Sequence, residues 1–159
     1  MLGIDLRRRT YPLLMTLLFL SGCISEHPLC PDLSHETSVK SAGCIVLNQN
    51  KLLVMEGMNG KISIPGGSGE PDETPRCSAH RETWEETGLD IRPQQLVRQF
   101  DNGFHLYRCD LHANSGSIDP PFKLEVRRAF WLAPEEFDDH QWRFPEQKEW
   151  LRHYIRKQH

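Results

Sequence analysis

The sequence predicts an α/β or α+β fold in which helices sandwich a β-sheet. The chain has 159 residues, which is enough for one domain with a real core but not for two. Short apolar runs bounded by Gly, Pro and Asn recur along it and predict strands. Two segments with helix signals interrupt these runs, and strands with helices inserted between them form a sheet covered by helices.

The first 22 residues have the parts of a secretory signal peptide. Three consecutive arginines precede an apolar run, residues 11–20, and small residues follow it. The apolar run is about half of the ~20 residues that a membrane span needs. A permanent transmembrane helix is therefore the weaker interpretation.

The signal ends in Leu-Ser-Gly-Cys, residues 20–23, which resembles the bacterial lipobox. In that motif the cysteine becomes the lipidated first residue of the mature chain. We therefore expect residues 1–22 to be removed and Cys23 to anchor the protein to a membrane outside the cytoplasm. The alternative is that Met15 is the true first residue, in which case the protein is cytoplasmic.

A tether and a strand-rich segment follow the signal. Residues 23–37 contain two prolines and little periodicity, which predicts a tether in front of a domain that covers residues 38–159. Two apolar runs around residues 48–50 predict a β-hairpin. Residues 61–64 predict a short strand that runs into a Gly/Pro loop.

A helix is predicted over residues 75–87. Thr74 suits the N-cap, and Pro75 suits the first helical position, where a missing N–H costs nothing. Gly88 suits the left-handed position just past the helix end.

The second half of the chain predicts three strands and a closing helix. Residues 95–100 and 104–111 flank an Asn-Gly turn, and residues 122–132 predict the third strand. Residues 146–157 predict an amphipathic helix. Its apolar face holds Trp150, Leu151, Tyr154 and Ile155.

The cysteines and the charge set limits on partners. Of the five cysteines, Cys23 is assigned to the anchor, and the other four allow zero, one or two disulfides with three complete pairings. No Cys-x-x-Cys spacing occurs, so neither a zinc site nor a redox motif is predicted. The net charge of -3 gives no reason to expect a nucleic-acid polymer as partner.

Three glutamates gather on one face of the predicted helix. Glu82, Glu85 and Glu86 stand at i, i+3 and i+4, where unpaired like charges repel by about 1 kcal/mol or more. A divalent cation reverses the sign, because Mg²⁺ and Mn²⁺ prefer oxygen ligands. The plain alternative is a solvated face on which Arg81 pairs with Glu85.

The spacing around these glutamates favours a site. Gly67 is followed after five residues by Glu73, and seven residues later Arg81 and Glu82 open the stretch "RETWEETGL". This pattern resembles the Nudix box, which identifies the chain as a member of the Nudix hydrolase family. Thr83 departs from it, because an aliphatic residue is usual there. A threonine at this inner position can hydrogen-bond back to its own helix, so we expect a change in packing only.

The resemblance implies an α/β/α sandwich around a mixed sheet and hydrolysis of a small-molecule diphosphate. Arg81 would orient the glutamates, while Gly67, Glu73 and Gly88 would support the loops of the box. A bound metal would neutralise the diphosphate and lower the pKa of the attacking water. The implied ligands of Mg²⁺ or Mn²⁺ are Glu82, Glu85, Glu86 and the Gly66 carbonyl.

The general base and the substrate stay open at this level. Glu82 and Glu125 are the candidates for the base. Phe104 and Tyr107 are candidates for stacking on a nucleobase, and Trp131 is the weaker one because it suits the core.

The expected substrate is a nucleoside diphosphate linked to another moiety, such as a nucleotide sugar or a dinucleoside polyphosphate. The alternatives are a lipid (prenyl) diphosphate or a Nudix-fold module that binds without turnover. The intact glutamates argue against the binding module. A calcium-binding surface protein fits less well, because the ligands lie on a helix and not in a 12-residue loop.

Overall fold

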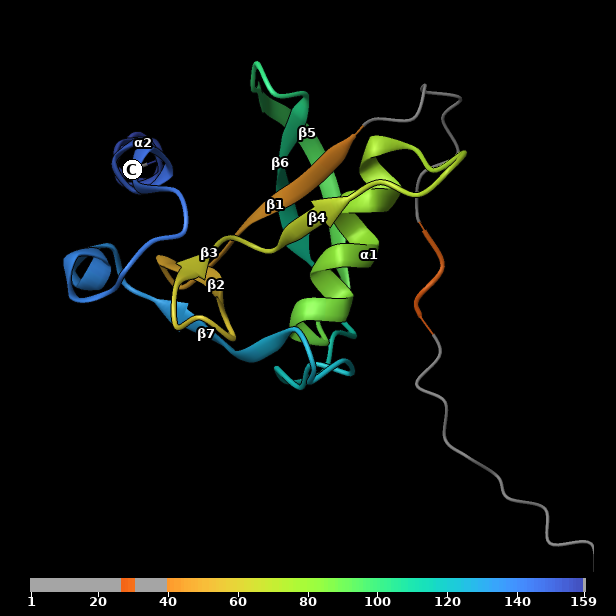
Figure 1. Cartoon of the computed structure of the whole chain (residues 1–159), viewed down its shortest axis with the longest axis horizontal. Coiled ribbons are helices and arrows are strands. Elements are labelled where there is room, and N and C mark those ends of the chain that lie inside the picture. The colour runs from red at the N-terminus through yellow and green to blue at the C-terminus, as the bar shows by residue number, and fades with distance from the viewer. Residues whose placement is uncertain (1–26, 31–39, 159) are drawn as a thin grey trace, which may run out of the picture.

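The computed structural model describes residues 27–30 and 40–158. Its seven-stranded sheet has the order β3-β2-β1-β6-β5, with β4 pairing with β1 and β7 with β2 (Figure 1). The β1–β6 pair is parallel and the other pairs are antiparallel, so the sheet is mixed. The strands are β1 (Ser41–Asn48), β2 (Lys51–Gly57), β3 (Ile62–Ser63), β4 (Gly66–Ser68), β5 (Ile91–Gln99), β6 (Phe104–Leu111) and β7 (Val126–Leu132).

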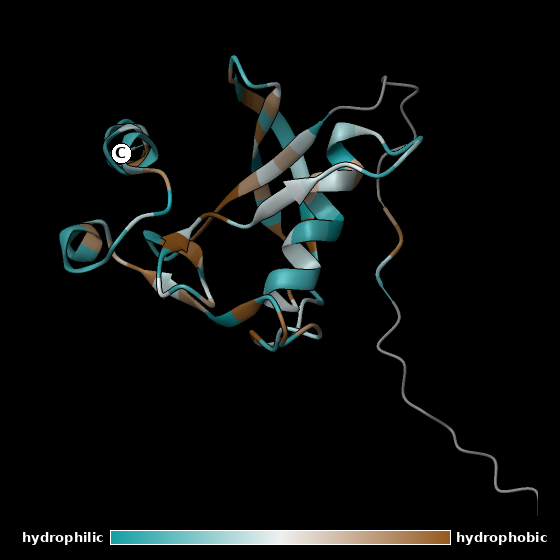
Figure 2. Ribbon diagram, in the orientation of Figure 1, coloured by the Kyte–Doolittle hydropathy of each residue, from teal (hydrophilic) through white to brown (hydrophobic). Residues whose placement is uncertain are grey.

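Helices cover both faces of this sheet, as the α/β prediction requires. Helix α1 (Pro75–Thr87) contributes Ala79 to a core cluster that includes Val46 and Ile91. Helix α2 (Pro145–Arg156) contributes Leu151 and Ile155 to the other cluster. Hydrophobic colour is concentrated on the strands in Figure 2, whereas α1 and α2 are mainly hydrophilic. Because α2 buries Leu151 and Ile155 in the core, the predicted apolar face of the closing helix is confirmed.

The local signals for the first hairpin and for α1 are confirmed. Strands β1 and β2 pair around a turn in which Gln49 and Asn50 both have positive φ, the conformation of a tight hairpin turn. The Thr74 side chain accepts a hydrogen bond from the Cys77 N–H at 3.2 Å, and Gly88 has a φ of 76°. These contacts start and stop α1 at the predicted residues.

Thr83 faces inward on α1. It is fully buried, and its hydroxyl donates to the Ala79 carbonyl at 2.7 Å. The back-bond satisfies the hydroxyl within the helix itself. The position at which the sequence departs from the usual aliphatic residue therefore lies on the buried face of α1.

The structure corrects three boundaries. Residues 66–68, expected as loop, form β4 and pair with β1. Strand β5 starts at Ile91 and not at residue 95, with register shifts after Pro93 that accommodate a residue without an N–H. Strand β7 starts at Val126, so residues 122–125 precede the sheet. A 3₁₀ helix, η1 (Pro134–Asp139), was not expected.

Two disulfides resolve the open cysteine pairing. Cys30 is bonded to Cys77, which ties the described segment 27–30 to the first turn of α1. Cys44 is bonded to Cys109 inside the core, between the parallel strands β1 and β6. The two bonds close long loops, with sequence separations of 47 and 65 residues.

The predicted signal peptide and lipidation site, Cys23 included, lie outside the described residues. Within the described part of the chain, no helix is long and apolar enough to span a membrane.

Replacing Gly88 with alanine is expected to lower the free energy of unfolding by at least about 2 kcal/mol. The residue has a left-handed backbone, and an added Cβ would collide with the backbone of Asp119. Chemical denaturation of the variant measures the loss. The matched control is Gly116→Ala, because a Cβ at that position meets nothing within 4 Å. An equal loss in both variants would contradict this explanation.

Candidate active site

The candidate site forms where β4 meets α1. The Gly66 N–H donates to Oε2 of Glu86 at 2.8 Å. The carboxylate of Glu82 lies so close to Gly67 that a Cβ there would collide with it. Glycine at position 67 therefore leaves room for the Glu82 side chain of α1, whereas glycine at position 66 lets β4 lie close to the β1 backbone at Ala42 and Gly43. Two of the three glutamates predicted as metal ligands, Glu82 and Glu86, therefore lie against the backbone of the glycine loop.

Arg81 holds the acidic residues of the site in place. Its Nε lies 3.0 Å from Glu73, and its Nη1 lies 3.0 Å from Glu82 and 3.0 Å from Glu85. Its Nη2 donates to the Ser68 carbonyl of β4 at 2.7 Å. Burial disfavours the guanidinium charge, but the three carboxylates raise the pKa of Arg81 above its usual value. One arginine thus connects the loop, the helix and the glutamates.

Glu73 is held by three donors at the helix entrance. It accepts from the Ser78 hydroxyl at 2.7 Å and from the Glu70 N–H at 3.0 Å, in addition to Arg81. Burial acts to raise the pKa of Glu73, but these donors lower it overall. The residue therefore stays ionised and holds the turn that enters α1.

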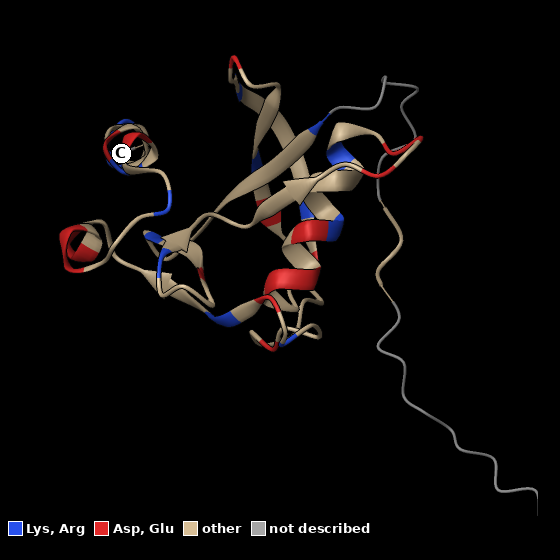
Figure 3. Cartoon of the chain, viewed as in Figure 1, with Lys and Arg blue, Asp and Glu red and all other residues tan. Residues whose placement is uncertain are grey.

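Glu86 and Glu82 carry charge that the protein itself does not fully compensate. Burial raises the pKa of Glu86 to about 8, and the nearby charges of Glu82 and Glu125 add to the rise. Burial likewise raises the pKa of Glu82. Figure 3 shows the resulting acidic band on α1. Glu82 shares the single charge of Arg81 with other carboxylates, and Glu86 has no ion-pair partner among the described residues. Such partly buried, undercompensated carboxylates fit a divalent cation, which relieves both burial and mutual repulsion.

The glutamates would have to move to bind that cation. Within the described residues, no group of three or more His, Cys, Asp or Glu side chains is arranged to hold a metal ion as it stands. The reason is visible in their hydrogen bonds, because Glu82 and Glu85 point to Arg81 and Glu86 points to the Gly66 N–H. Rotations of long side chains would bring them together.

Two cavities flank this cluster. The first, the acidic cavity, has a volume of about 250 Å³ and contains all three glutamates of the helix face. Its remaining wall comes from the segment before β7, which places Glu125 beside them, as the hypothesis for the base requires. The residues from this segment are Phe122, Leu124, Glu125 and Val126.

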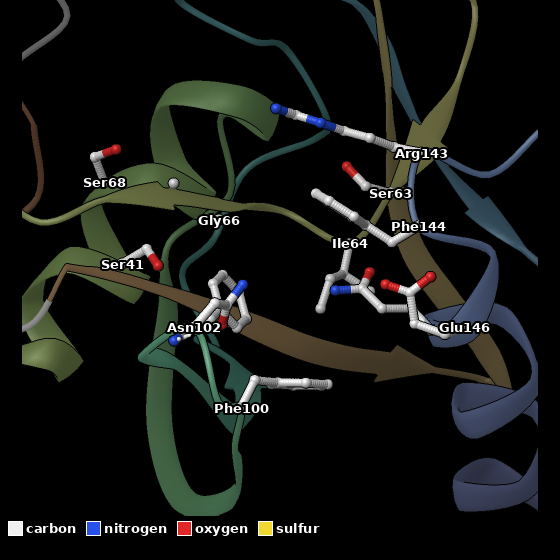
Figure 4. Close-up of a pocket in the computed structure, with 13 residues that line it drawn as sticks. Ser41, Ser63, Ile64, Gly66, Ser68, Phe100, Asn102, Arg143, Phe144 and Glu146 are labelled. Carbon is white, nitrogen blue, oxygen red and sulfur yellow. Dashed lines mark hydrogen bonds between the residues drawn. The ribbon is translucent and has the colours of Figure 1, made fainter.

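The second, the aromatic cavity, lies on the other side of Gly66 and Gly67 and has a volume of about 240 Å³ (Figure 4). Its walls come from β1, the β5–β6 turn and the start of α2. The side chains that matter below are Phe100, Asn102, Phe104, Arg143 and Phe144.

The structure separates the aromatic candidates. Phe104 lines the aromatic cavity. Tyr107 is 2% exposed and belongs to a core cluster, with the guanidinium of Arg76 over its ring. Trp131 packs partly buried against the same cluster. Only Phe104 of these three lies where a ligand ring has access.

Sequence reasoning missed Arg143 and Phe144. They lie between η1 and α2, far along the chain from the glycine loop that they face across the cavity. No motif marks them, so only the tertiary fold reveals their place. Phe100 and Asn102 lie at the Asn-Gly turn that the sequence predicts, but a turn signal does not indicate that these residues line a cavity.

Comparisons with known proteins agree with this geometry. Residues 37–154 match the NUDIX domain. The MutT-like protein of Streptomyces ambofaciens is 32% identical over 108 residues, which are 64% of this chain and 68% of that protein. Phosphatase NudJ of Escherichia coli K12 is 43% identical over 61 residues, which are 36% of this chain and only 40% of NudJ.

Solved structures share the fold. An ADP-ribose pyrophosphatase from Streptococcus suis superimposes with a TM-score of 0.59 at 21% identity, over 77% of this chain and 96% of that one. A UDP-X diphosphatase gives 0.63 at 18% identity, over 81% of this chain and 68% of that one. At these identities the likeness shows the fold alone. The NUDIX domain match, however, extends over most of the chain, and the chain therefore belongs to the Nudix hydrolase family.

Proposed function

We propose that this Nudix hydrolase cleaves the diphosphate linkage of a nucleoside diphosphate joined to another moiety. The observation that carries the proposal is the pair of cavities on the two sides of the contact between Gly66 and Glu86. A diphosphate at this contact would place one substituent in each cavity. The aromatic cavity is small by the standard of ligand sites, which suits a single ring system.

The proposed ligands of Mg²⁺ or Mn²⁺ are Glu82, Glu85, Glu86 and Gly66. When bound, the cation supplies charge neutralisation at the diphosphate and a lower pKa for water. Arg81 keeps Glu82 and Glu85 within reach of the site. Glu125 is exposed and lines the same cavity, so it is our candidate to accept the proton of the attacking water.

The names of two structural neighbours are compatible with this class of substrate. The names ADP-ribose pyrophosphatase and UDP-X diphosphatase each refer to a nucleoside diphosphate joined to a second group. The likeness to them concerns the fold, so the cavities and not these names support the substrate proposal.

A substrate panel tests the proposal. The full chain is incubated with Mg²⁺ or Mn²⁺ and with nucleotide sugars, dinucleoside polyphosphates, nucleoside triphosphates and a prenyl diphosphate. We expect two phosphate-bearing products from at least one nucleoside diphosphate derivative, detected by chromatography. Absence of hydrolysis across the whole panel with both metals would refute the proposal.

A lipid diphosphate is the second candidate, and one observation favours it. Phe122 and Leu124 are 54% and 90% exposed, and both border the acidic cavity beside the glutamates. Exposed apolar side chains at that place suit an apolar chain attached to the diphosphate. Preferential hydrolysis of the prenyl diphosphate in the same panel would select this alternative.

Replacing Phe104 with alanine is expected to raise the KM for nucleotide substrates about 10-fold, because stacking on a base is lost. Steady-state kinetics on the best substrate of the panel measure it. Phe104→Leu keeps the apolar packing but not the ring, so it should show a similar rise. Leu111→Ala is the control, since Leu111 is exposed at the far end of the same strand. Unchanged KM values in both Phe104 variants would remove the residue from the site.

We also propose that the protein is an exported lipoprotein in which residues 1–22 are removed and Cys23 is lipidated. The two disulfides support an oxidising compartment. Cys23→Ser should release the protein from the membrane fraction. Membrane association that survives the substitution would contradict lipidation at Cys23.

A further inference from the structure

Arg143 differs from Arg81, the other arginine of the site, in having no ion-pair partner among the described residues. It is exposed, it lines the aromatic cavity, and it takes part in none of the ion pairs of the described residues. Arg81, by contrast, is surrounded by carboxylates. A guanidinium that faces a cavity without a carboxylate partner has all its donors available to a ligand.

The backbone fixes the position of Arg143 relative to the glycine loop. The Arg143 N–H donates to the Ile62 carbonyl at 2.8 Å, and the Ile62 N–H donates to the Gln141 carbonyl at 2.8 Å. Between them Trp142 is buried and donates from its indole to the Phe137 carbonyl at 2.9 Å. Arg143 is thus attached to β3, the strand that leads directly into Pro65 and the glycines.

The side chain points toward the acidic cluster. Figure 4 shows Arg143 extending from the segment before α2 across the cavity toward α1. The guanidinium carbon of Arg143 lies 5.2 Å from the centre of the Phe144 ring, which limits the directions that it can take.

We propose that Arg143 binds one of the two substrate phosphates, the phosphate on the side of the aromatic cavity. Guanidinium groups match the geometry of phosphate oxygens and form two parallel charge-assisted hydrogen bonds with them. Arg143 stands between the two parts that such a substrate would occupy, the glutamates of α1 and the aromatic walls. This inference rests on the proposed function, because it assigns a role within the same site.

The assignment makes the two phosphates unequal. The phosphate held by Arg143 carries the group in the aromatic cavity. The other phosphate faces the acidic cavity and Glu125. Arg143 is therefore a substrate-binding residue that fixes the direction in which the substrate lies.

Binding of methylenediphosphonate, a diphosphate analogue that cannot be hydrolysed at its bridge, tests the inference. Calorimetric titration of the full chain in the presence of Mg²⁺ gives the Kd. Arg143→Gln is expected to weaken binding about 10- to 100-fold, and Arg143→Lys should recover part of that loss. Arg156→Gln, at the end of α2, removes an exposed arginine outside both cavities and should leave the Kd unchanged.

The outcomes separate this inference from the proposed function. A wild-type Kd in Arg143→Gln, an equal loss in Arg156→Gln, or no binding by the wild-type chain would overturn the role of Arg143. Hydrolysis of the substrate panel by the wild-type chain is scored independently. Arg143-dependent binding without any hydrolysis would keep the inference and refute the enzymatic proposal. Thermal melting of each variant shows whether the fold is intact.

Discussion

Glu86→Gln is expected to reduce metal-dependent hydrolysis by at least about 100-fold, because even residues that only support metal ligands cost 10- to 100-fold when lost. Glutamine keeps the size of the side chain and can still accept the Gly66 N–H through its carbonyl. It loses the negative charge that a divalent cation requires. Initial rates on the best substrate of the panel, at saturating Mg²⁺, measure the effect.

The same substitution should leave the fold at least as stable in the absence of metal. Burial raises the pKa of Glu86 from 4.5 to about 8, so the folded wild type binds more protons than the unfolded chain in this range. The stability that this group contributes is present below pH 4.5 and is lost as the pH rises through about 8. Glu86→Gln lacks that dependence, and denaturation in EDTA at pH 5 and pH 8.5 should show it.

Glu135→Gln is the matched control, since Glu135 is exposed on η1 and remote from the cluster in sequence. It should change neither the rate nor the pH dependence. Full activity in Glu86→Gln would remove Glu86 from the metal site. A lower stability of Glu86→Gln at pH 8.5 would show that its charge is better compensated than we infer.

Replacing both Cys44 and Cys109 with alanine is expected to lower the free energy of unfolding by about 4 kcal/mol or more. Opening a loop of this length releases roughly that much chain entropy in the unfolded state. The two sulfurs also lie in the core, with Cys44 fully buried and Cys109 3% exposed, so their loss leaves a small cavity. Urea denaturation of oxidised wild type and variant measures the difference.

The second disulfide provides the comparison. Cys30 and Cys77 close a loop of similar length but are only partly buried. Their replacement should cost less, because no comparable cavity forms. If both double variants lost the same amount, the packing contribution of the buried pair would be absent.

The parts of the fold that follow from local chemistry could be predicted from the sequence. Helix α1 is set by Thr74, Pro75 and Gly88, which act within a turn of its ends. Strand β4 could not be predicted, because three residues of Gly-Gly-Ser have no strand pattern of their own and pair only because β1 lies beside them. Its existence depends on a contact between segments more than twenty residues apart.

The residues of the site likewise fall into those predictable from local spacing and those that depend on the tertiary fold. The box places Arg81 and the glutamates on one helix, where spacing alone determines which side chains meet. Tyr107 was a candidate for the site but is buried, since β6 lies between β1 and β5 and both of its faces are covered there. Arg143 was not a candidate but lines the cavity, because its position depends on backbone hydrogen bonds to β3.

The Cys30–Cys77 disulfide would shorten the tether of a chain lipidated at Cys23. Without the bond, the tether would run from Cys23 to β1 at Ser41 and reach about 60 Å when extended. With the bond, it would run only from Cys23 to Cys30, and these seven residues reach about 25 Å. His27 also packs against Trp84 of α1, with ring centres 5.1 Å apart. The first turn of α1, where Cys77 lies, would then stay within about 25 Å of the lipid anchor, plus the width of the disulfide.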